Sequence, residues 1–485
     1  MHHHRSEASA RHMTGTAIHW FRRDLRLEDN PALAAALAGD TQVLCVYIHA
    51  PDEEAPWPPG AASRWWLHHS LAALQNVLAK RGARLHIFRG ESRNVLESLV
   101  RQTGAAAVYW NRLYEPAVIQ RDAAIKQSLR SLGTAAQSFN AGLLTEPWAI
   151  ETGDGGPYRV FTPYWRKARS LLQPHPPISA PKRIDSVEVD GSQDLEALGL
   201  LPRIRWDAEF PAHWQPGERG AQALLRRFGA RAVSTYPDER NRPDRDGTSR
   251  LSPHLHFGEI GPRQIFWALS QVARDAPASS SAVEAYVREL GWRDFSHHLL
   301  YHFPKTPVES LNPQFNTFPW AGEDRHAVGR WQHGTTGVPI VDAGMRQLWK
   351  SGWMHNRVRM IVASFLTKNL RQHWLHGARW FWDTLVDADL ANNTQGWQWT
   401  AGCGADAAPY FRVFNPVTQG ERFDPDGDYV RRWVPELKRV PAPLIHQPWI
   451  DPELLGRTGY PAPVVDLRAS REAALAAYRQ MRGES

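Results

Sequence analysis

Cysteine is scarce in this chain of 485 residues, in which only Cys45 and Cys403 occur. So few cysteines exclude a disulfide framework or a cysteine-based metal cluster, and they suit a reducing cytoplasm, the compartment we predict. A run of about 18 apolar residues is also missing, so the sequence predicts no membrane span. The chain does not open with a basic segment followed by an apolar one, so we expect no secretory signal.

Lysine is scarce too, because eight lysines leave 49 of the 57 basic residues as arginine in a chain of net charge +7. Arginine presents a planar fork to phosphate oxygens, so a polyanionic partner is one interpretation. The other is an arginine-rich proteome that places arginine on solvated faces. Charge alone leaves both interpretations open.

Two glycine-rich motifs and one metal motif are absent. A dinucleotide fold would place G-x-G-x-x-G after its first strand, but residues 21–31 hold no glycine, and no G-x-x-x-x-G-K-[ST] occurs. Nothing therefore supports NAD or ATP at the usual crevice. The 22 histidines show no H-E-x-x-H or comparable spacing, so we expect no metal site.

Residues 16–140 alternate between short apolar runs and helical patterns. Between the second and third runs, residues 63–81 predict a helix that Ser63 caps and Gly82 ends. Such alternation predicts a doubly wound, mostly parallel, Rossmann-like sheet in an α/β domain. The runs that we expect to be strands are 17–21, 43–48, 84–88 and 105–110.

The rest of the chain divides by its texture. Residues 146–215 are rich in proline, glycine and charge, and predict a long connection over the surface. Residues 216–485 predict a mainly α domain, and the α/β domain is then expected at 13–145. Residues 1–12, MHHHRSEASARH, are expected to be a leader ahead of a natural start at Met13. The helices expected in the α domain include 221–228, 282–301, 341–352 and 354–370.

Tryptophan is what the chain has in plenty. Its 22 tryptophans outnumber 17 phenylalanines and 12 tyrosines, and ten of them lie between Trp292 and Trp399. An indole can fill a core, stack on a flat ligand or base, or pass a single electron. Assigning each tryptophan to one of these roles is therefore close to assigning the function.

Polar clusters mark four places that could carry chemistry. The first is Tyr236 with the hydroxyl-rich segment 247–253, which offers hydroxyl and backbone N–H groups to a phosphate; a plain capped helix start is the alternative. The second is Glu289, Trp292 and Arg293, which share one helical face. An amphipathic helix with an exposed Glu–Arg pair is the alternative there.

The third cluster lies at residues 352–360. On a helix, Trp353, Asn356 and Met360 would align on one face, with Arg359 beside them. Buried amides need hydrogen-bond partners, so the asparagine is either a satisfied core residue or a ligand contact.

The fourth cluster, DADLANNTQGWQW at residues 387–399, does not show a helical pattern. In an extended segment Trp397 and Trp399 would point in different directions. Metal binding by the two aspartates lacks further ligands. We therefore expect one of the aspartates to pair with an arginine such as Arg359.

Together these segments resemble the photolyase/cryptochrome family from about Met13 to the C-terminus. The segments 19–27, HWFRRDLRL, and 157–165, PYRVFTPYW, are similar to the family, and the last three clusters match its FAD and substrate pocket in order and spacing. The resemblance implies an α/β antenna domain joined to a helical domain that binds FAD and DNA.

The resemblance also implies the residues around a U-shaped FAD that is active as FADH⁻. Asn393 would lie near flavin N5, and Arg359 would form an ion pair with Asp387. Tyr286 departs from the family, since many relatives carry tryptophan there. The residues that would line the flavin are Tyr236, Thr248, Ser249, Arg250, Leu251, Ser252, Arg293, Asn356, Arg359, Asp387, Asp389 and Asn393.

Within the family, the sequence resembles enzymes that repair cyclobutane pyrimidine dimers in UV-damaged DNA. Asn356 and Met360 stand where the (6-4) branch carries histidines, and a soft, apolar methionine suits a thymine dimer. Glu289 would hydrogen-bond the polar edge of the dimer, and Trp292 and Trp399 would form the walls of its slot. Light-excited FADH⁻ would donate an electron to the flipped-out dimer and regain it after the ring splits.

Further partners follow from the resemblance. The expected DNA contacts are Arg357, Arg412 and Gln419, with Trp292, on single- or double-stranded DNA, in a protein that acts as a monomer. The segment 108–115 lies where a folate antenna would bind; we expect a folate in preference to a deazaflavin, with no antenna as the open alternative.

A flavin that is oxidised needs a reduction route, and the family uses three tryptophans in a row. Trp397 and Trp374 match the inner two, and Trp320 is the outer candidate.

A cryptochrome-type light sensor that binds FAD without repairing DNA is the alternative from another class. Three features favour repair. Asn393 stands where plant-type sensors commonly carry aspartate, the set of dimer-pocket residues is complete, and no long tail follows Arg432. The missing histidine pair disfavours a (6-4) enzyme, and a flavin-free structural protein is the remaining alternative.

Overall fold

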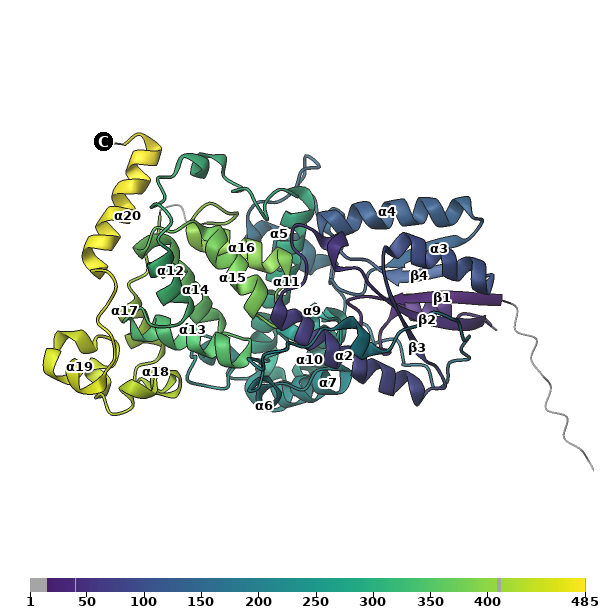
Figure 1. Cartoon of the computed structure of the whole chain (residues 1–485), viewed down its shortest axis with the longest axis horizontal. Coiled ribbons are helices and arrows are strands. Elements are labelled where there is room, and N and C mark those ends of the chain that lie inside the picture. The colour runs from purple at the N-terminus through teal and green to yellow at the C-terminus, as the bar shows by residue number, and fades with distance from the viewer. Residues whose placement is uncertain (1–14, 40, 408–410, 485) are drawn as a thin grey trace, which may run out of the picture.

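The computed structural model describes residues 15–39, 41–407 and 411–484 of the chain, so the expected leader and Met13 lie outside the described residues. The described chain forms a sheet-containing part and a larger helical part. Figure 1 shows the sheet, with α3 and α4, at one end of the long axis and the C-terminal helices at the other.

The first part contains a five-stranded parallel sheet of order β3-β2-β1-β4-β5. Because β1 pairs with both β2 and β4, the chain order reverses at β1, as in a doubly wound sheet. Four strands confirm the expected runs, and the fifth was not named because AAQSF has little apolar contrast. The strands are β1 Gly15–Phe21, β2 Thr41–His49, β3 Leu85–Arg89, β4 Ala107–Asn111 and β5 Ala135–Phe139.

Helices cover both faces of this sheet. Alternate β1 side chains serve the two faces: Trp20 packs with α3 and α4, whereas Phe21 packs with α2. Ser63 does not cap α2, because the helix begins at Ala61 and Ser63 lies buried inside its first turn. Gly82 follows the helix end in the left-handed region, with a φ of 84°. The helices are α1 Pro31–Ala36, α2 Ala61–Ala79, α3 Ser92–Thr103 and α4 Pro116–Ser131.

The segment 146–215 contains a helix, α5 (Phe161–Leu171). The expectation of a connection over the surface is wrong for α5, because Phe161 and Tyr164 are fully buried in the core of the helical part. The sequence hid this helix because FTPYWRKARSL mixes apolar and basic residues over only three turns. The division of the chain at 145/146 and 215/216 stays a prediction.

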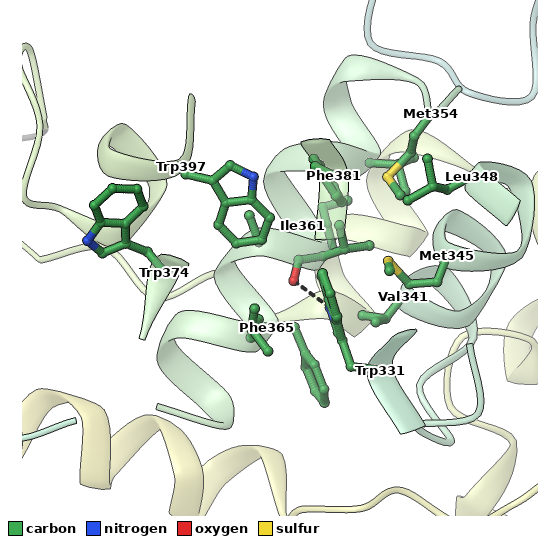
Figure 2. Packing of buried hydrophobic residues seen from close by; sticks show 14 of the residues in the cluster. Trp331, Val341, Met345, Leu348, Met354, Ile361, Phe365, Trp374, Phe381 and Trp397 are labelled. Atoms are coloured by element: carbon green, nitrogen blue, oxygen red, sulfur yellow. Dashed lines mark hydrogen bonds between the residues drawn. The ribbon is translucent and has the colours of Figure 1, made fainter. Parts of the chain in front are cut away.

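The second part is helical, and its core is rich in indole rings and methionines. Trp331 is fully buried and donates from Nε1 to the carbonyl oxygen of Val362 at 3.0 Å (Figure 2). Its helices are α6 Phe210–His213, α7 Glu218–Arg227, α8 Tyr236–Glu239, α9 Ser252–His256, α10 Pro262–Asp275, α11 Ser280–His302, α12 Arg325–Gln332, α13 Pro339–Ser351, α14 Asn356–Ser364, α15 Trp374–Thr384, α16 Leu390–Ala401, α17 Pro416–Phe423, α18 Asp428–Trp433, α19 Pro452–Thr458 and α20 Leu467–Arg482. None of the described helices is both long and apolar enough to cross a bilayer.

The third polar cluster does not lie on one helix. Helix α14 begins at Asn356 because the side chain of His355 accepts the amide N–H of Arg357, so Trp353 precedes the helix. Asn356 and Met360 do share a face, at i and i+4. The helix expected at 354–370 is present as one helical stretch, which begins at Asn356 and ends in a π-helical turn at Phe365–Asn369.

The fourth cluster is helical, contrary to expectation. Helix α16 starts after Asp389, whose carboxylate accepts the N–H of Asn392 at 2.9 Å as an N-cap. The sequence concealed the helix because residues on several of its faces are buried, including Leu390, Trp397 and Gln398, so no apolar stripe alternates with a solvated one.

Candidate active site

One large pocket of about 560 Å³ opens between α11, α14, α15 and α16. Its volume lies in the usual range for a cofactor or small-molecule site. Residues that were assigned from the sequence to the dimer, to the flavin, to DNA and to electron transfer meet at this pocket. Those that line the pocket are Glu289, Trp292, Asn356, Arg357, Arg359, Met360, Asp387, Asp389, Asn393, Trp397, Trp399 and Arg412.

The residues that line the pocket differ in their exposure to solvent. Asn356 and Arg412 are exposed and Met360 is half-buried, whereas Asp387 and Asp389 are each only 8% exposed. The pocket therefore has an open mouth lined by an amide, a thioether and a guanidinium. Its buried part is lined by carboxylates, the groups that hold a polar ligand most strongly when water is kept out.

Glu289 stands at the mouth, on α11. Its Oε1 accepts from Arg240 Nη1 at 2.7 Å, and both side chains are partly exposed. The Glu–Arg pair considered from sequence was Glu289 with Arg293, but Arg293 points elsewhere and donates to the carbonyl oxygen of Gly142. Glu289 is thus held by Arg240, the residue that directly follows α8.

Trp292 is braced from behind by α5. Its ring stacks on Phe161 with centroids 3.7 Å apart and planes 12° apart. The two helices approach closely because Gly291 has no side chain: a Cβ there would lie 2.3 Å from Trp165. Trp399, across the pocket, donates from Nε1 to the carbonyl oxygen of Asp406 at 3.1 Å. Both indoles are fixed in orientation while part of each stays exposed.

The expected arginine–aspartate pair is present. Arg359 Nη2 donates to Asp387 Oδ2 at 2.7 Å, and Arg359 Nε donates to the carbonyl oxygen of Met354 at 2.7 Å. Ser252 donates its hydroxyl proton to the same carboxylate oxygen at 2.6 Å. The other oxygen, Asp387 Oδ1, is buried and has no hydrogen-bond partner among the described residues. A buried oxygen of this kind is available to a donor from a bound ligand or an ordered water.

Asp389 is a buried carboxylate between two histidines. Its Oδ2 lies 3.4 Å from His297 Nε2 and 3.6 Å from His256 Nδ1. Burial alone would raise its pKa, but the His297 charge and the histidine hydrogen bonds hold the pKa well below the usual range. Asn393, one turn into α16, donates to the carbonyl oxygen of Ala378 at 3.0 Å.

The hydroxyl-rich segment lies beside the pocket, and only Ser252 reaches it, through Asp387. Ser249 accepts the hydroxyl proton of Tyr286 at 2.8 Å, so tyrosine at this position keeps a polar bond to the segment. Arg250 has a φ of 55° and lies over the rings of Trp214 and Trp353 at 4.5 and 5.2 Å. The candidates that do not line the pocket are Tyr236, Thr248, Ser249, Arg250, Leu251, Ser252, Arg293, Trp320, Trp374 and Gln419.

Two of the three electron-transfer candidates are deeply buried and lie close together. Trp397 packs with the outer edge of its indole against α15, where a Cβ at Gly377 would lie 1.9 Å from its ring. Trp374 begins α15 one turn earlier, and Figure 2 shows its ring beside that of Trp397. The ring of His373 lies 5.6 Å from Trp374 and 5.0 Å from the partly exposed Trp320. The three indoles thus run from the pocket wall outward.

Sequence reasoning missed several residues of the site. Arg240 and Asn241 line the pocket, and Asn241 Oδ1 accepts from Arg357 Nη2 at 2.8 Å. Neither belongs to a periodic pattern, so only the nearby Tyr236 could have drawn attention to them. His297 was passed over because one histidine in a helix that contains several carries no signal. Among the described residues, no group of three or more histidine, cysteine, aspartate or glutamate side chains is arranged so that it could hold a metal ion.

The fold and the pocket define a protein with a parallel α/β domain packed against a helical domain that offers a carboxylate-lined cofactor pocket. Residues 17–182 match the family described as DNA photolyase, and residues 286–480 match the FAD binding domain of DNA photolyase. The chain belongs to the photolyase/cryptochrome family, as its relatives establish.

Three relatives show the extent of the likeness. The deoxyribodipyrimidine photo-lyase of Agrobacterium fabrum is 47% identical over 475 residues, 96% of this chain and 98% of that protein. Cryptochrome-1 of Arabidopsis thaliana is 38% identical over 491 residues, 96% of this chain and 70% of that protein. A crystal structure of a bacterial class III photolyase from Agrobacterium tumefaciens superimposes with a TM-score of 0.92, at 46% identity, covering 99% of this chain and 100% of that one.

Proposed function

We propose that this chain repairs cyclobutane pyrimidine dimers in DNA by light-driven electron transfer, a carbon–carbon lyase reaction. The observation that carries the proposal is the pocket itself. Glu289, Trp292, Asn356, Met360 and Trp399 gather at the mouth of the cavity whose buried wall holds Asp387, Asp389 and Asn393. A lesion at the mouth and a flavin at the wall would then be neighbours.

The residues of the buried wall fit FAD. Asp387 Oδ1 is buried and receives no hydrogen bond from the described residues, so it can accept one from a ligand. Arg359 neutralises this carboxylate from the other side at 2.7 Å. When bound, reduced FAD supplies the light-excited electron that opens the cyclobutane ring and is regained afterwards. The residues of the chain would hold and orient the flavin and the dimer and keep water away from them.

The mouth suits a flipped-out dimer. Two indole walls, Trp292 and Trp399, offer stacking surfaces for bases, and Met360 offers a soft apolar contact to a thymine methyl group. Glu289 can exchange its partly exposed ion pair with Arg240 for hydrogen bonds to the polar edge of the dimer. Flipping costs less for a damaged, poorly stacked step, which would contribute selectivity for the lesion.

The rim of the pocket is cationic, which favours damaged DNA as the partner. Burial lowers the pKa of Arg357, and the neighbouring charges of Arg240, Arg422 and Arg412 lower it further. Such mutual repulsion is relieved when phosphates bind between the arginines. We assign Arg357, Arg412 and Gln419 to the backbone around the lesion, in double- or single-stranded DNA, in a cytoplasmic monomer.

A folate antenna is the chromophore that we propose for the α/β side. A cavity of about 250 Å³ lies between the α/β and helical domains, lined by Glu54, Trp57 and Trp382, with the two indole rings 5.6 Å apart. Of the segment 108–115, where the folate was expected, Glu115 alone lines this cavity. Aromatic rings and a carboxylate are the contacts that a flat, amino-substituted pterin ring would use. Adding a methenyl-folate to the purified protein should produce a bound near-UV absorption band; a deazaflavin that binds in its place would replace the assignment.

The second candidate function is a light sensor, since cryptochrome-1 of Arabidopsis thaliana is among the relatives. Asn393, an amide without an acidic proton, and the complete dimer slot favour repair over sensing. Asn356 and Met360 favour cyclobutane dimers over (6-4) photoproducts, because neither side chain serves proton chemistry at neutral pH.

Substrate choice tests the proposal. The purified protein should be yellow with flavin absorption; a colourless preparation would remove the cofactor from the account. Chemically reduced protein is illuminated with two duplexes, one with a cyclobutane thymine dimer and one with a (6-4) photoproduct. We expect repair of the first alone. Repair of the second would assign the chain to the other branch, and repair of neither would favour the sensor.

A further inference from the structure

A second, much smaller cavity adjoins the large pocket. Its volume is about 30 Å³, and it lies where the two domains meet. A space of this size is enough for water when polar groups line it. Asp389 lines both the large pocket and the small cavity, so one carboxylate connects the two spaces.

The small cavity is lined by buried ionisable side chains of alternating charge. Arg23 of the α/β domain lies 2.6 Å from Glu115, and His297 of the helical domain lies 3.4 Å from Asp389. Glu115 Oε2 is buried and has no hydrogen-bond partner among the described residues. All four side chains belong to residues with little exposed surface. Glu115 from the α/β domain, and His297 with Asp389 from the helical domain, thus face the same small cavity.

A third space, here called the cleft, lies at the carboxyl ends of β1 and β2, where Trp20, Ile48 and His49 line it. Arg23 and His256 line the small cavity and also the cleft, which has a volume of about 70 Å³. Polar side chains therefore connect the cleft, through Glu115, His297 and Asp389, with the buried wall of the large pocket. A stack of protonatable groups and water-sized spaces is what a proton route requires.

His297 differs from the other buried histidines of the described chain. Its Nδ1 lies 3.0 Å from the carbonyl oxygen of Arg293, and its Nε2 faces Asp389, so both ring nitrogens meet acceptors and the imidazolium form is favoured. Although burial lowers its pKa, the Asp389 charge raises the pKa above the usual value, whereas burial lowers the pKa of His298 to about 4. The ionisable groups that face His297 are Asp389, Arg293, Asp294, Glu115 and Tyr114.

We propose that His297 supplies, through Asp389, the proton that accompanies reduction of the flavin, and that Glu115 returns a proton to it from the cleft. The proposal rests on the proposed function, since it takes FAD as the ligand of the large pocket. Conversion of oxidised FAD to FADH⁻ takes up two electrons and one proton. The tryptophans can carry the electrons, but Asn393 has no acidic proton to give.

The step balances with a dithiol as reductant. The added dithiol gives two electrons and two protons and becomes a disulfide; the electrons enter through the tryptophans and both protons go to solvent. One proton leaves His297 for the flavin, and one proton from solvent restores the imidazolium through the small cavity. His297 is therefore unchanged after each cycle.

Two conservative variants test the route in the flavin-loaded, full-length protein. His297→Gln keeps a hydrogen-bond donor for Asp389 but cannot release a proton, and Glu115→Gln removes the charge that faces the imidazolium. His302→Gln, a histidine on the same helix that does not line either cavity, is the matched control. We expect proton uptake during photoreduction to slow by roughly 100-fold or more in His297→Gln, the usual effect of removing an acid catalyst. The first electron transfer from tryptophan should keep its wild-type rate.

A second readout does not depend on photoreduction. In ¹⁵N-histidine NMR of the flavin-loaded wild type, one imidazole should titrate above pH 6.5; its signal should be missing in His297→Gln and its midpoint should fall in Glu115→Gln. The His302→Gln protein should behave as wild type in both experiments.

Three results would overturn the proposal. The first is proton uptake at the wild-type rate in His297→Gln, and the second is a wild type with no imidazole that titrates above pH 6.5. The third is an equal loss of electron transfer and of bound flavin in His297→Gln and Glu115→Gln, which would make the two residues structural supports. Failure of the proposed repair function can be distinguished from failure of the proposed proton route. A wild type that photoreduces with proton uptake through His297 but leaves dimers intact would contradict repair alone.

Discussion

Glu289 is the residue whose role in repair can be isolated most cleanly. Its present partner, Arg240, lies 2.7 Å away in a pair that is more than a quarter exposed on each side, so the pair contributes little to stability. Glu289→Ala should therefore leave folding and flavin binding intact. Loss of hydrogen bonds to a charged group costs about 1.5–3 kcal/mol, so repair should fall roughly 10- to 100-fold.

The control for this variant is Glu284→Ala, a carboxylate on the same helix that pairs with Arg169 outside the pocket. Repair rates and flavin absorption of both proteins are compared with those of wild type. If Glu289→Ala loses its flavin, Glu289 belongs to the cofactor contacts and not to the dimer slot.

Asp294 gives the fold a pH dependence. Thr145 donates to it from the backbone at 2.8 Å, and burial raises the pKa of Asp294 to about 6. An unfolded aspartate titrates near 4, so between about pH 4 and 6 the folded chain keeps a proton that the unfolded chain has released. The free energy of unfolding therefore falls as pH rises through this window.

The asparagine of Asp294→Asn binds no such proton, so its free energy of unfolding should not fall in this window. Relative to that of wild type, the free energy of unfolding of the variant should therefore rise by roughly 1–3 kcal/mol between pH 4 and pH 7. Urea unfolding at pH 4, 5, 6 and 7 measures the difference. Asp275→Asn, at an exposed site, should follow the wild-type curve. Parallel curves for wild type and Asp294→Asn would contradict the assignment.

The contact of α15 with α16 depends on one glycine. A Cβ at Gly377 would lie 1.9 Å from the ring of Trp397, so Gly377→Ala must displace either the indole or the helix. We expect a loss of about 1–3 kcal/mol from overpacking, although alanine favours a helix interior. Gly329→Ala in α12, where nothing lies within 4 Å of the added methyl group, should instead stabilise by about 0.5–1 kcal/mol. Thermal unfolding that ranks the two variants in the opposite order would contradict this packing.

Trp397 itself tests the electron route. Trp397→Phe should block photoreduction of the flavin, because phenylalanine does not pass electrons as an indole does, while repair by chemically reduced protein continues. Trp380→Phe, in which the altered ring stacks on Trp349 on another face of α15, should photoreduce normally. Transient absorption after a laser flash distinguishes them, and unchanged photoreduction in Trp397→Phe would remove it from the route.

The sequence predicted the elements in which one pattern of apolar residues dominates. It missed elements whose side chains pack against several different parts of the molecule. Strands β1 to β4 have mostly apolar sequences because both faces of the sheet are covered, and these were found. Helix α16 was missed because its residues face α15, the pocket and the core at once, so no apolar stripe remains. Ser63 shows the limit of cap signals, since a serine inside a first turn looks the same as one before it.

The candidate site was predictable where residue types are unusual for their position. Asp387, Asn356 and the indoles at 397 and 399 stand out in the sequence, and they do meet at one pocket. Arg240 and Glu115 could not be found this way, because each depends on a contact between segments far apart in the chain. Long-range charge pairing leaves no local pattern.

The whole molecule should bind DNA by its cationic rim. Arg357 is assigned a phosphate contact, so Arg357→Gln should weaken binding at every sequence and lower the slope of log affinity against log salt by about one unit. Arg130→Gln, an exposed arginine at the end of α4 in the α/β domain, should leave the slope unchanged. Binding is measured at several salt concentrations with a dimer-containing duplex. An unchanged slope in Arg357→Gln would move the DNA contact away from this rim.

The central claim is that the large pocket holds a flavin and a dimer at the same time and repairs the dimer with light. The most direct measurement is loss of a single thymine dimer from a short DNA duplex, followed by chromatography, with chemically reduced protein in light and in darkness. The account predicts dimer loss in light alone, with intact thymines restored. No light-dependent loss of the dimer by protein that carries reduced flavin would contradict it.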